Sequence, residues 1–516
     1  MNARRVSVVV LLLGSSICAL IGADQVQKSE IAFSPVIPRT WNDQAVASIE
    51  LPLASTGVPP EHISGDYYYQ MPVRPIYKSY PIYAPGKEPA GYFEQLKQRE
   101  PEIVFDPATL KTEADWIKAG EFAFDAPIAY DSDPIALGLV TLSGVRNPAW
   151  YQKVGVRLTN DGVMPHARYV IRKKGTVEIG NLACAMCHTR VTADGSVIKG
   201  AQGNFPFDRA LAFDARAASQ PEQRLELERG FLQLLFGTPW LRADPLAQIA
   251  QTSLDALMSI YEAIPPGVLA RHGSSPLYPV QVPDLIGIKD RRYLDRTGLV
   301  RHRDIGDLMR YGALNQDADV LSRYAGFRPV EVFSDGTLPD PATLGRYSDE
   351  QLYALASYIY SLTPPPNPNR SNALAARGQR VFEREGCAGC HTPPLYTNNK
   401  LTPVAGFKSP ADHAAKNDIL NVSVGTDPNL ALRTRRGTGY YKVPSLKGVW
   451  YRGPFEHNGS VAMLEDWFDP RRLRDDYVPT GFKGYGMPSR AVKGHEFGLR
   501  LSDEDKRALI AFLKTL

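Results

Sequence analysis

Cysteine, net charge and long apolar runs are all scarce in this sequence of 516 residues. The 59 Lys and Arg against 55 Asp and Glu leave a formal charge of only +4, so the composition does not predict a nucleic-acid partner. Beyond the N-terminus no apolar run is long enough to cross a bilayer, which excludes a multi-span membrane protein. With 43% hydrophobic and 22% charged residues the chain is globular, and its length predicts roughly two to four domains.

The N-terminal segment has the pattern of a secretory signal peptide. Arg4 and Arg5 precede an apolar stretch over residues 6–22, and the small Ala23 is followed by the polar Asp24. An uncleaved membrane anchor is the alternative, because the apolar stretch is close to the shortest length that spans. We expect residues 1–23 to be a signal peptide and the rest to be periplasmic or secreted.

The cysteines other than Cys18 all lie in two copies of the motif C-x-x-C-H. The copies are Cys184-Ala-Met-Cys187-His188 and Cys387-Ala-Gly-Cys390-His391. Two thiols three positions apart on a tight turn can reach the two vinyl groups of one haem, and the adjacent histidine then offers a ring nitrogen to the iron. The motifs therefore predict two covalently bound haem c groups. We call them haem 1, with proximal ligand His188, and haem 2, with proximal ligand His391.

Three other uses of these cysteines fit less well. A zinc ribbon places its cysteine pairs much closer in sequence than Cys187 and Cys387. A redox-active dithiol would explain neither the second copy nor the histidine after each pair. Since haem attachment uses every cysteine after Cys18, no pair is left for a disulfide, even in an oxidising compartment.

A weak internal duplication follows the two motifs. The segments 282–298 and 443–459 share Val-Pro, Gly, Arg, an acid and a second Gly at a constant offset of 161 residues. The segments 348–362 and 502–516 match at an offset of 154 residues, and each begins with Ser-Asp-Glu. Serine caps helices, acids favour the first helical turn, and the following apolar residues recur at helical spacing. These matches predict two related haem domains, each closed by a helix.

We therefore expect a mainly α protein with two cytochrome c-like haem domains and a long irregular N-terminal extension. A Pro/Tyr-rich arm would occupy residues 24–110, the first haem domain 111–366 and the second haem domain 367–516. The proline-rich residues 364–369 form a stiff linker, and a helix restarts at about Ala373 and leads into Cys387. The first domain differs, because residues 168–179 alternate and predict extended chain before Cys184.

The sixth iron position separates electron carriers from catalysts, because an open site can bind an oxidant. Haem 2 has three ligand candidates. We favour His495, on a glycine-flanked loop before the closing helix; Met487 is the alternative, and we assign His457 to hydrogen bonding around the haem. In the first domain, the positions that correspond to His457 and His495 at the offsets of 161 and 154 residues are Arg296 and Pro341.

Neither Arg296 nor Pro341 can ligate iron in this way, so haem 1 is predicted to be open. Four other side chains of the first domain remain as ligand candidates for haem 1. They are Met258, His272, His302 and Met309.

Two stretches resemble a known family. Residues 441–460, Tyr-Lys-Val-Pro-Ser-Leu-Lys-Gly-Val-Trp-Tyr-Arg-Gly-Pro-Phe-Glu-His-Asn-Gly-Ser, and Gly494-His-Glu-Phe-Gly498 look like the di-haem family that contains bacterial rubber oxygenase. That family is itself similar to the bacterial di-haem cytochrome c peroxidases. The resemblance implies that His391 and His495 both ligate haem 2, while haem 1 has His188 as its one protein ligand and an oxygen-binding face.

Two departures from that family are visible. No histidine lies between His188 and His272, whereas di-haem peroxidases carry a distal histidine soon after their first motif. The family also places a tryptophan between its haems, and here Trp240 is a candidate and Tyr293 a substitute. The peroxidase mechanism and polyisoprene as substrate therefore do not follow from the resemblance.

Three functions are consistent with the sequence. The first is a di-haem oxidoreductase that uses O₂ or peroxide at haem 1, with His188 as the catalytic residue and haem 2 as electron relay. The second is a pure electron-transfer cytochrome with both haems six-coordinate. The third is a subunit of a larger respiratory complex. A redox partner protein or a small electron donor or acceptor is expected in the first two cases.

Overall fold

The computed structural model describes residues 33–133, 140–271 and 273–516. The predicted signal peptide and His272 lie outside the described residues. Across the described ranges, none of the helices has the length and apolar character needed to cross a membrane.

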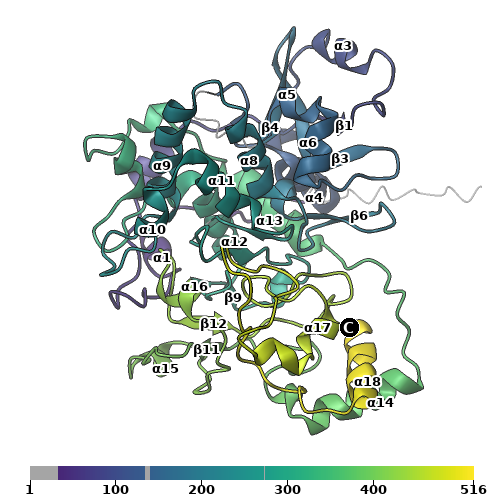
Figure 1. Ribbon diagram of the computed structural model, residues 1–516. Coiled ribbons are helices and arrows are strands. Elements are labelled where there is room, and N and C mark those ends of the chain that lie inside the picture. The colour runs from purple at the N-terminus through teal and green to yellow at the C-terminus, as the bar shows by residue number, and fades with distance from the viewer. Residues whose placement is uncertain (1–32, 134–139, 272) are drawn as a thin grey trace, which may run out of the picture.

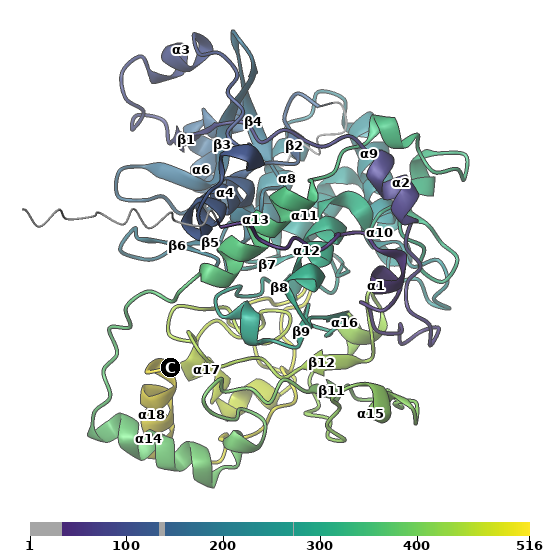
Figure 2. The ribbon, with the colours of Figure 1, turned by 180° about the vertical axis from the view of Figure 1, so that it is seen from behind.

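Two pairs of crossed helices organise the chain, one in each half (Figure 1). In the first pair, α4 (Glu113–Asp125) packs against α13 (Asp349–Ser361). In the second pair, α14 (Ala373–Arg384) packs against α18 (Asp503–Lys514). The residues between the pairs run as extended chain along the outside of the molecule (Figure 2), as the proline-rich linker predicts.

Serine side chains begin both closing helices, as predicted. The Ser348 hydroxyl accepts a hydrogen bond from the backbone N–H of Gln351 at α13, and the Ser502 hydroxyl accepts one from Asp505 at α18. Each cap satisfies a backbone donor that the first helical turn leaves unpaired. The predicted helix starting at Ala373 is also confirmed.

The two helix crossings are built in the same way. A Cβ on Gly120 of α4 would lie 1.9 Å from the carbonyl oxygen of Ala354, and a Cβ on Gly378 of α14 would lie 1.9 Å from that of Ala508. Ala354 and Ala508 are related by the 154-residue offset. Glycine is therefore needed at both crossings, and α4 is the counterpart of α14.

The sequence analysis did not find α4, because residues 126–183 separate it from Cys184, whereas only residues 385–386 separate α14 from Cys387.

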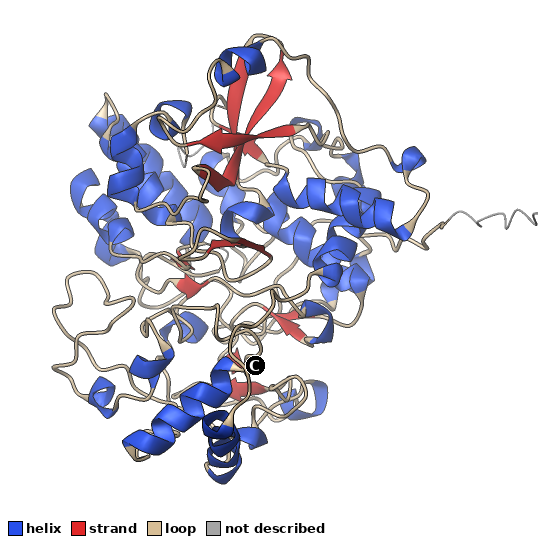
Figure 3. Ribbon diagram, turned by 90° about the vertical axis from the view of Figure 1, so that its right-hand side faces the viewer, coloured by secondary structure: helices blue, strands red, loops and turns tan. Residues whose placement is uncertain are grey.

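A four-stranded antiparallel sheet occupies the end of the molecule far from the second helix pair (Figure 3). Its order is β1 (Ser79–Tyr83), β3 (Val163–Lys173), β4 (Thr176–Asn181) and β2 (Ala129–Tyr130). Strands β3 and β4 form the extended segment predicted over residues 168–179, and β4 leads directly to the first C-x-x-C-H motif.

The N-terminal arm is more regular than the sequence analysis predicts. It supplies β1 and contains α1 (Asp43–Ala47), α2 (Gly65–Gln70) and α3 (Tyr92–Lys97). These elements are five or six residues long, too short for a periodic pattern to mark them in the sequence. Tertiary packing orders them: Trp41 stacks on Tyr68 with ring centres 4.6 Å apart inside the largest core.

The remaining elements connect or cover these parts, and α7 (Cys184–Cys187) carries the cysteines of the first C-x-x-C-H motif. The other α-helices are α5 (Leu142–Val145), α6 (Pro148–Val154), α8 (Phe207–Arg216), α9 (Pro221–Phe236), α10 (Ala247–Ala250), α11 (Leu254–Glu262), α12 (Ile305–Ala313), α15 (His413–Lys416), α16 (Asn429–Leu432) and α17 (Leu464–Trp467). The two-stranded sheets pair β5 (Thr189–Val191) with β6 (Val197–Lys199), β7 (Val268–Leu269) with β8 (Val280–Gln281), β9 (Tyr293–Leu294) with β10 (Val300–Arg301), and β11 (Leu401–Pro403) with β12 (Tyr440–Lys442).

Each C-x-x-C-H motif adjoins a hydrophobic core. Cys184 packs against the core of α4, α12 and α13, and Cys187 packs against the core of the sheet, α8 and α11. Cys387 packs against a smaller core formed by α14 and α18. The apolar surroundings suit a haem, whose macrocycle is itself apolar.

The segments that repeat at an offset of 161 residues also share an unusual backbone. Asp295 and Glu456 have φ of 66° and 71°, a left-handed conformation uncommon for residues other than glycine. Gly287 and Gly448 both have φ of 73°. The sequence repeat is therefore a repeat of local conformation as well.

A buried ion pair ties the N-terminal arm to the second half of the chain. Glu50 accepts from Arg436 at 2.9 Å and lies 3.1 Å from the ring of His62, and all three side chains are almost fully buried. The pKa of Glu50 is lowered because His62 and Arg436 offset the cost of burying the carboxylate.

Candidate functional site

The first motif forms one helical turn, α7 (Cys184–Cys187), with His188 directly after it. The backbone N–H of His188 donates to the carbonyl of Cys184 at 2.9 Å, which continues the turn. The ring Nδ1 of His188 lies 3.0 Å from the carbonyl oxygen of Pro283. Because a carbonyl can only accept, Nδ1 carries the proton and Nε2 is left to bind a metal.

The second motif repeats this arrangement on a short 3₁₀ turn, Cys387–Gly389. The backbone N–H of His391 donates to Cys387 at 2.8 Å, and its Nδ1 lies 3.1 Å from the carbonyl of Tyr396. Burial lowers the pKa of His391 to about 4, so the ring is neutral at physiological pH. A neutral imidazole is the form that ligates iron.

The four described cysteines are partly buried, and burial raises the pKa of each thiol. Burial raises the pKa of Cys184 to about 12 and those of Cys187 and Cys387 to about 11. Redox-active dithiols show the opposite shift, toward the thiolate. The four described cysteines form no disulfide, and no group of three or more His, Cys, Asp or Glu side chains in the described ranges could hold a metal ion. The raised pKa values do not fit a redox-active dithiol, and the described residues do not fit a zinc site.

His495 lies opposite His391, as the prediction for haem 2 requires. The two ring centres are 6.2 Å apart. Two imidazoles on one metal, with metal–nitrogen distances of about 2 Å, place their ring centres about 6 Å apart. The ring of His495 is buried and its Nδ1 has no hydrogen-bond partner, which is the kind of buried polar group that a bound haem iron can explain.

The loop around His495 holds the ring in this position. Its backbone N–H donates to Val424 at 2.6 Å, and its carbonyl accepts from Arg472 at 2.8 Å. Trp467 and Phe497 pack edge-on against the ring, with centres 5.2 and 5.3 Å away. The pKa of His495 falls to about 3, mainly because the site is desolvated, with His391 and Arg472 adding to the effect.

The two alternative ligands of haem 2 have other surroundings. Met487 is 48% exposed. His457 uses its Nδ1 for an ion pair with Glu456 at 2.7 Å and stacks on Tyr441 with ring centres 4.3 Å apart. The geometry thus favours His495 as ligand and agrees with a hydrogen-bonding role for His457.

Among the described candidates for haem 1, no side chain has a setting like that of His495. His302 has both ring nitrogens engaged, with the carbonyl of Arg291 at 2.7 Å and the hydroxyl of Tyr360 at 2.6 Å. Met258 and Met309 are packed inside hydrophobic cores.

The sequence analysis missed His166, which is fully buried on β3, with the backbone of Thr189 and the side chain of Asn204 as polar neighbours and the ring centre of Phe205 5.2 Å away. No motif surrounds His166, so only the tertiary structure reveals it.

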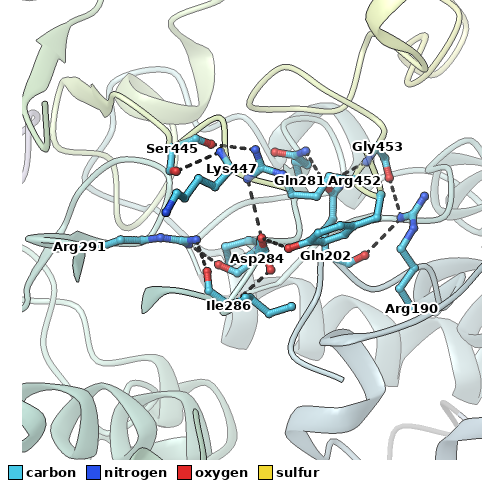
Figure 4. A network of polar contacts seen from close by, with 12 residues as sticks. Arg190, Gln202, Gln281, Asp284, Ile286, Arg291, Ser445, Lys447, Arg452 and Gly453 are labelled. Carbon is cyan, nitrogen blue, oxygen red and sulfur yellow. Dashed lines mark hydrogen bonds and ion pairs between the residues drawn. The ribbon is translucent and has the colours of Figure 1, made fainter. Parts of the chain in front are cut away.

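A small polar pocket adjoins both proximal histidines. Pro283 and Pro444, which occupy equivalent positions in the repeat, both line it, and Tyr293 lies at its wall. Asp284 also lines the pocket, and Figure 4 shows it near the middle of a network of polar contacts that includes Arg291 and Arg452. Trp240, the other candidate for a residue between the haems, is elsewhere: it donates to Ser55 at 3.0 Å and packs on Phe327. Tyr293 therefore has the better position, and Trp240 is not at the pocket.

Over about a quarter of its length, the sequence is similar to two curated proteins. It is 30% identical over 145 residues to the methylamine utilization protein MauG of Methylorubrum extorquens, covering 28% of this chain and 35% of MauG. It is 26% identical over 166 residues to the cytochrome-c peroxidase IdrP1 of Denitromonas iodatirespirans, covering 28% of this chain and 40% of the peroxidase. Each match spans less than half of the relative's length. No protein-family model matches the chain.

Two solved structures show weak likeness. They are hydrazine synthase of Kuenenia stuttgartiensis pressurised with xenon and a MauG-like protein associated with microbial copper homeostasis. Both are 16% identical with a TM-score of 0.28, and they cover 59% and 57% of this chain and 92% and 88% of their own chains. At this TM-score neither carries an argument. The sequence matches support a relationship to MauG and the di-haem cytochrome c peroxidases and do not bear on rubber oxygenase in particular.

Proposed function

We propose that the chain is an exported, periplasmic di-haem c-type cytochrome that acts as an oxidoreductase. Each crossed helix pair belongs to a cytochrome c-like domain, with haem 1 attached to Cys184 and Cys187 and haem 2 attached to Cys387 and Cys390. Haem 1 is the site that takes O₂ or peroxide, and haem 2 is the electron relay. The similarity to MauG and a cytochrome-c peroxidase supports this oxidoreductase class.

The contrast between the two proximal histidines carries the proposal. His391 has a second imidazole at a ring-centre distance of 6.2 Å, whereas among the described candidates for haem 1 named from the sequence, His302 has both ring nitrogens engaged and Met258 and Met309 lie in hydrophobic cores. An iron with two protein ligands transfers electrons, and an iron with a free position binds small oxidants. The haems supply the redox chemistry when bound.

The side chains around each motif orient the ligands. Pro283 fixes the tautomer of His188 and makes its ring more basic by accepting from Nδ1, and Tyr396 does the same for His391. Trp467 and Phe497 pack edge-on against the ring of His495 and hold its orientation. These contacts fix the ligand geometry before any electron moves, so little reorganisation is needed.

Low-temperature EPR of the oxidised protein tests the proposal. We expect one high-spin ferric haem, assigned to haem 1, and one low-spin ferric haem, assigned to haem 2. A pyridine haemochrome assay on the same sample should give two c-type haems per chain. Fewer than two would contradict the haem assignment itself.

One observation favours a second candidate, a pure electron-transfer cytochrome with both haems six-coordinate. His166 is a fully buried histidine whose polar neighbours are the backbone of Thr189, the residue directly after His188, and the side chain of Asn204, so its ring lies beside the first motif, where a ligand to haem 1 would lie. In that case EPR would show two low-spin haems. The variant His166→Ala would then convert one of them to high-spin, whereas it leaves the spectrum unchanged if haem 1 is open.

A further inference from the structure

The pocket beside the two proximal histidines is built from equivalent residues of the two repeats. Pro283 and Pro444 are related by the 161-residue offset, and so are Arg291 and Arg452. Pro283 accepts from His188, and the carbonyl of Pro444 is a second acceptor for the ring of His391. The pocket therefore lies where the two haem sites meet, and each repeat contributes one arginine to it.

The lining of this pocket carries an excess of positive charge. It contains four basic side chains and one carboxylate, that of Asp284. The basic side chains are Arg291, Arg296, Lys442 and Arg452. At the 161-residue offset, Arg296 corresponds to His457 and Lys442 corresponds to Gln281. Each of these two cations is therefore present in one repeat only, and we call them the added cations.

Backbone carbonyls are the main hydrogen-bond partners of these cations. Arg291 donates to the carbonyls of Asp284 and Ile286, and Arg452 donates to that of Ser445 at 2.7 Å. The nearest carboxylate oxygen of Asp284 is 3.9 Å from Arg452, beyond hydrogen-bond distance (Figure 4).

The two added cations are held even more weakly. Arg296 and Lys442 reach only the carbonyls of Gln281 and Tyr293, each at 3.4 Å.

Positive charges packed together away from water are costly unless an anion neutralises them. Burial lowers the pKa of Arg296 to about 9, and burial together with Arg291 and Arg296 lowers the pKa of Lys442. Asp295 acts on Arg296 and Lys442, and Asp290 acts on Arg291, from outside the lining, so with Asp284 three carboxylates face the four cations and positive charge remains in excess. A metal cation would add to the repulsion, so the missing partner must be an anion.

We propose that this pocket binds haem propionates. Lys442 and Arg296 are the principal cations, and Arg291 and Arg452 each bind a propionate of one of the two haems. This inference rests on the two haems of the proposed function. Each haem carries two propionate carboxylates, so two haems bring four negative charges to the four cations. Charge-assisted hydrogen bonds between guanidinium or ammonium and carboxylate are among the stronger polar contacts in proteins.

The assignment has a redox consequence. A positive charge held near a haem favours the ferrous form, because reduction lowers the charge of the iron. Since the pocket adjoins both proximal histidines, removing one of its cations should lower the reduction potentials of both haems together.

The test compares Lys442→Gln with Lys447→Gln, which removes the same charge from an exposed lysine five residues away that does not line the pocket. Haem content is first measured on each purified, fully processed protein. A protein with fewer than two haems would contradict the proposed function, and this result is distinct from a failure of the propionate proposal. Spectroelectrochemical titration then gives both potentials, and redox-difference infrared spectra report the propionate carboxylate bands.

We expect Lys442→Gln to lower both potentials and shift the carboxylate bands, Arg296→Gln to act in the same direction, and Lys447→Gln to have a much smaller effect. Lys442→Arg keeps the positive charge, so its reduction potentials should stay close to those of the wild type. This variant separates the loss of charge from poor folding of Lys442→Gln. Unchanged potentials and bands in Lys442→Gln with two haems bound would overturn the proposal. The potentials are also measured in chloride and in phosphate at equal ionic strength. A difference between the two buffers would overturn the proposal, because an exchangeable small anion would then occupy the pocket.

Discussion

The region around His188 and the region around His391 are assembled from the same parts. Each has a glycine-dependent helix crossing, a tight turn carrying two cysteines, and a Val-Pro segment whose carbonyl faces the proximal histidine. They differ in what lies on the other side of the histidine. The second region has His495 there, while the first has Pro341 at the equivalent position and also contains a sheet, an arm and a larger core. The comparison suggests how one scaffold can serve either electron transfer or reaction with a small molecule.

The largest expected effect concerns binding of external ligands. Carbon monoxide, cyanide or imidazole should perturb about half of the haem, because an open iron offers a vacant position whereas a bound His495 must first dissociate. His188→Ala should abolish this response, and the optical spectrum of haem 2 should stay nearly the same. If neither haem responds, the two regions do not differ in the proposed way.

The next effect tests the ligand of haem 2 directly. His495→Ala should convert haem 2 from low-spin to high-spin, since water binds iron more weakly than imidazole. Met487→Ala is the matched control, because Met487 is a nearby exposed alternative ligand, and it should leave the EPR spectrum unchanged. Loss of a methionine–iron absorption band in Met487→Ala would show that the ligand choice is wrong.

Cysteine substitutions test whether attachment is equivalent in the two regions. Cys187→Ala and Cys390→Ala should each remove one thioether and lower the thermal stability of the corresponding region. Both haems should stay with the wild-type chain in a denaturing gel, and each variant should retain less haem. An unchanged haem signal in either variant would mean that the cysteine is not an attachment point.

The smallest expected effect sharpens the comparison of the helix crossings. Gly120→Ala and Gly378→Ala should each destabilise the protein by about 1–3 kcal/mol, because the added Cβ would overlap a backbone carbonyl that cannot move freely. Gly312→Ala, whose Cβ would meet only Leu352 at an ordinary 3.4 Å on α12, should be neutral or slightly stabilising. Denaturant unfolding of the three variants measures the differences. Equal behaviour of Gly120→Ala and Gly312→Ala would argue that the first crossing is not equivalent to the second.

Local signals in the sequence predicted much of this arrangement. The serine caps at Ser348 and Ser502 and the helix at Ala373 follow from short-range patterns, and the structure confirms them. His495 was favoured because it lies on a glycine-flanked loop before the last helix, and that loop brings it to His391. The haems themselves remain predictions from the C-x-x-C-H motifs.

Long-range features escaped the sequence analysis for a physical reason. Helix α4 is separated from its motif by an inserted sheet, so no local pattern links Gly120 to Cys184. The cations of the pocket come from positions up to 161 residues apart, and only folding brings Arg291 and Arg452 together. The short helices of the arm depend on packing against Trp41 rather than on their own periodicity.

The ion pair between Glu50 and Arg436 sets an order of events as the chain is made. The partners are 386 residues apart, so the arm cannot close until nearly all of the chain has emerged. Cys184 and Cys187 emerge before Arg436, when the ion pair between the arm and the second half has not yet formed. Formation of this ion pair therefore marks the point at which the finished molecule closes.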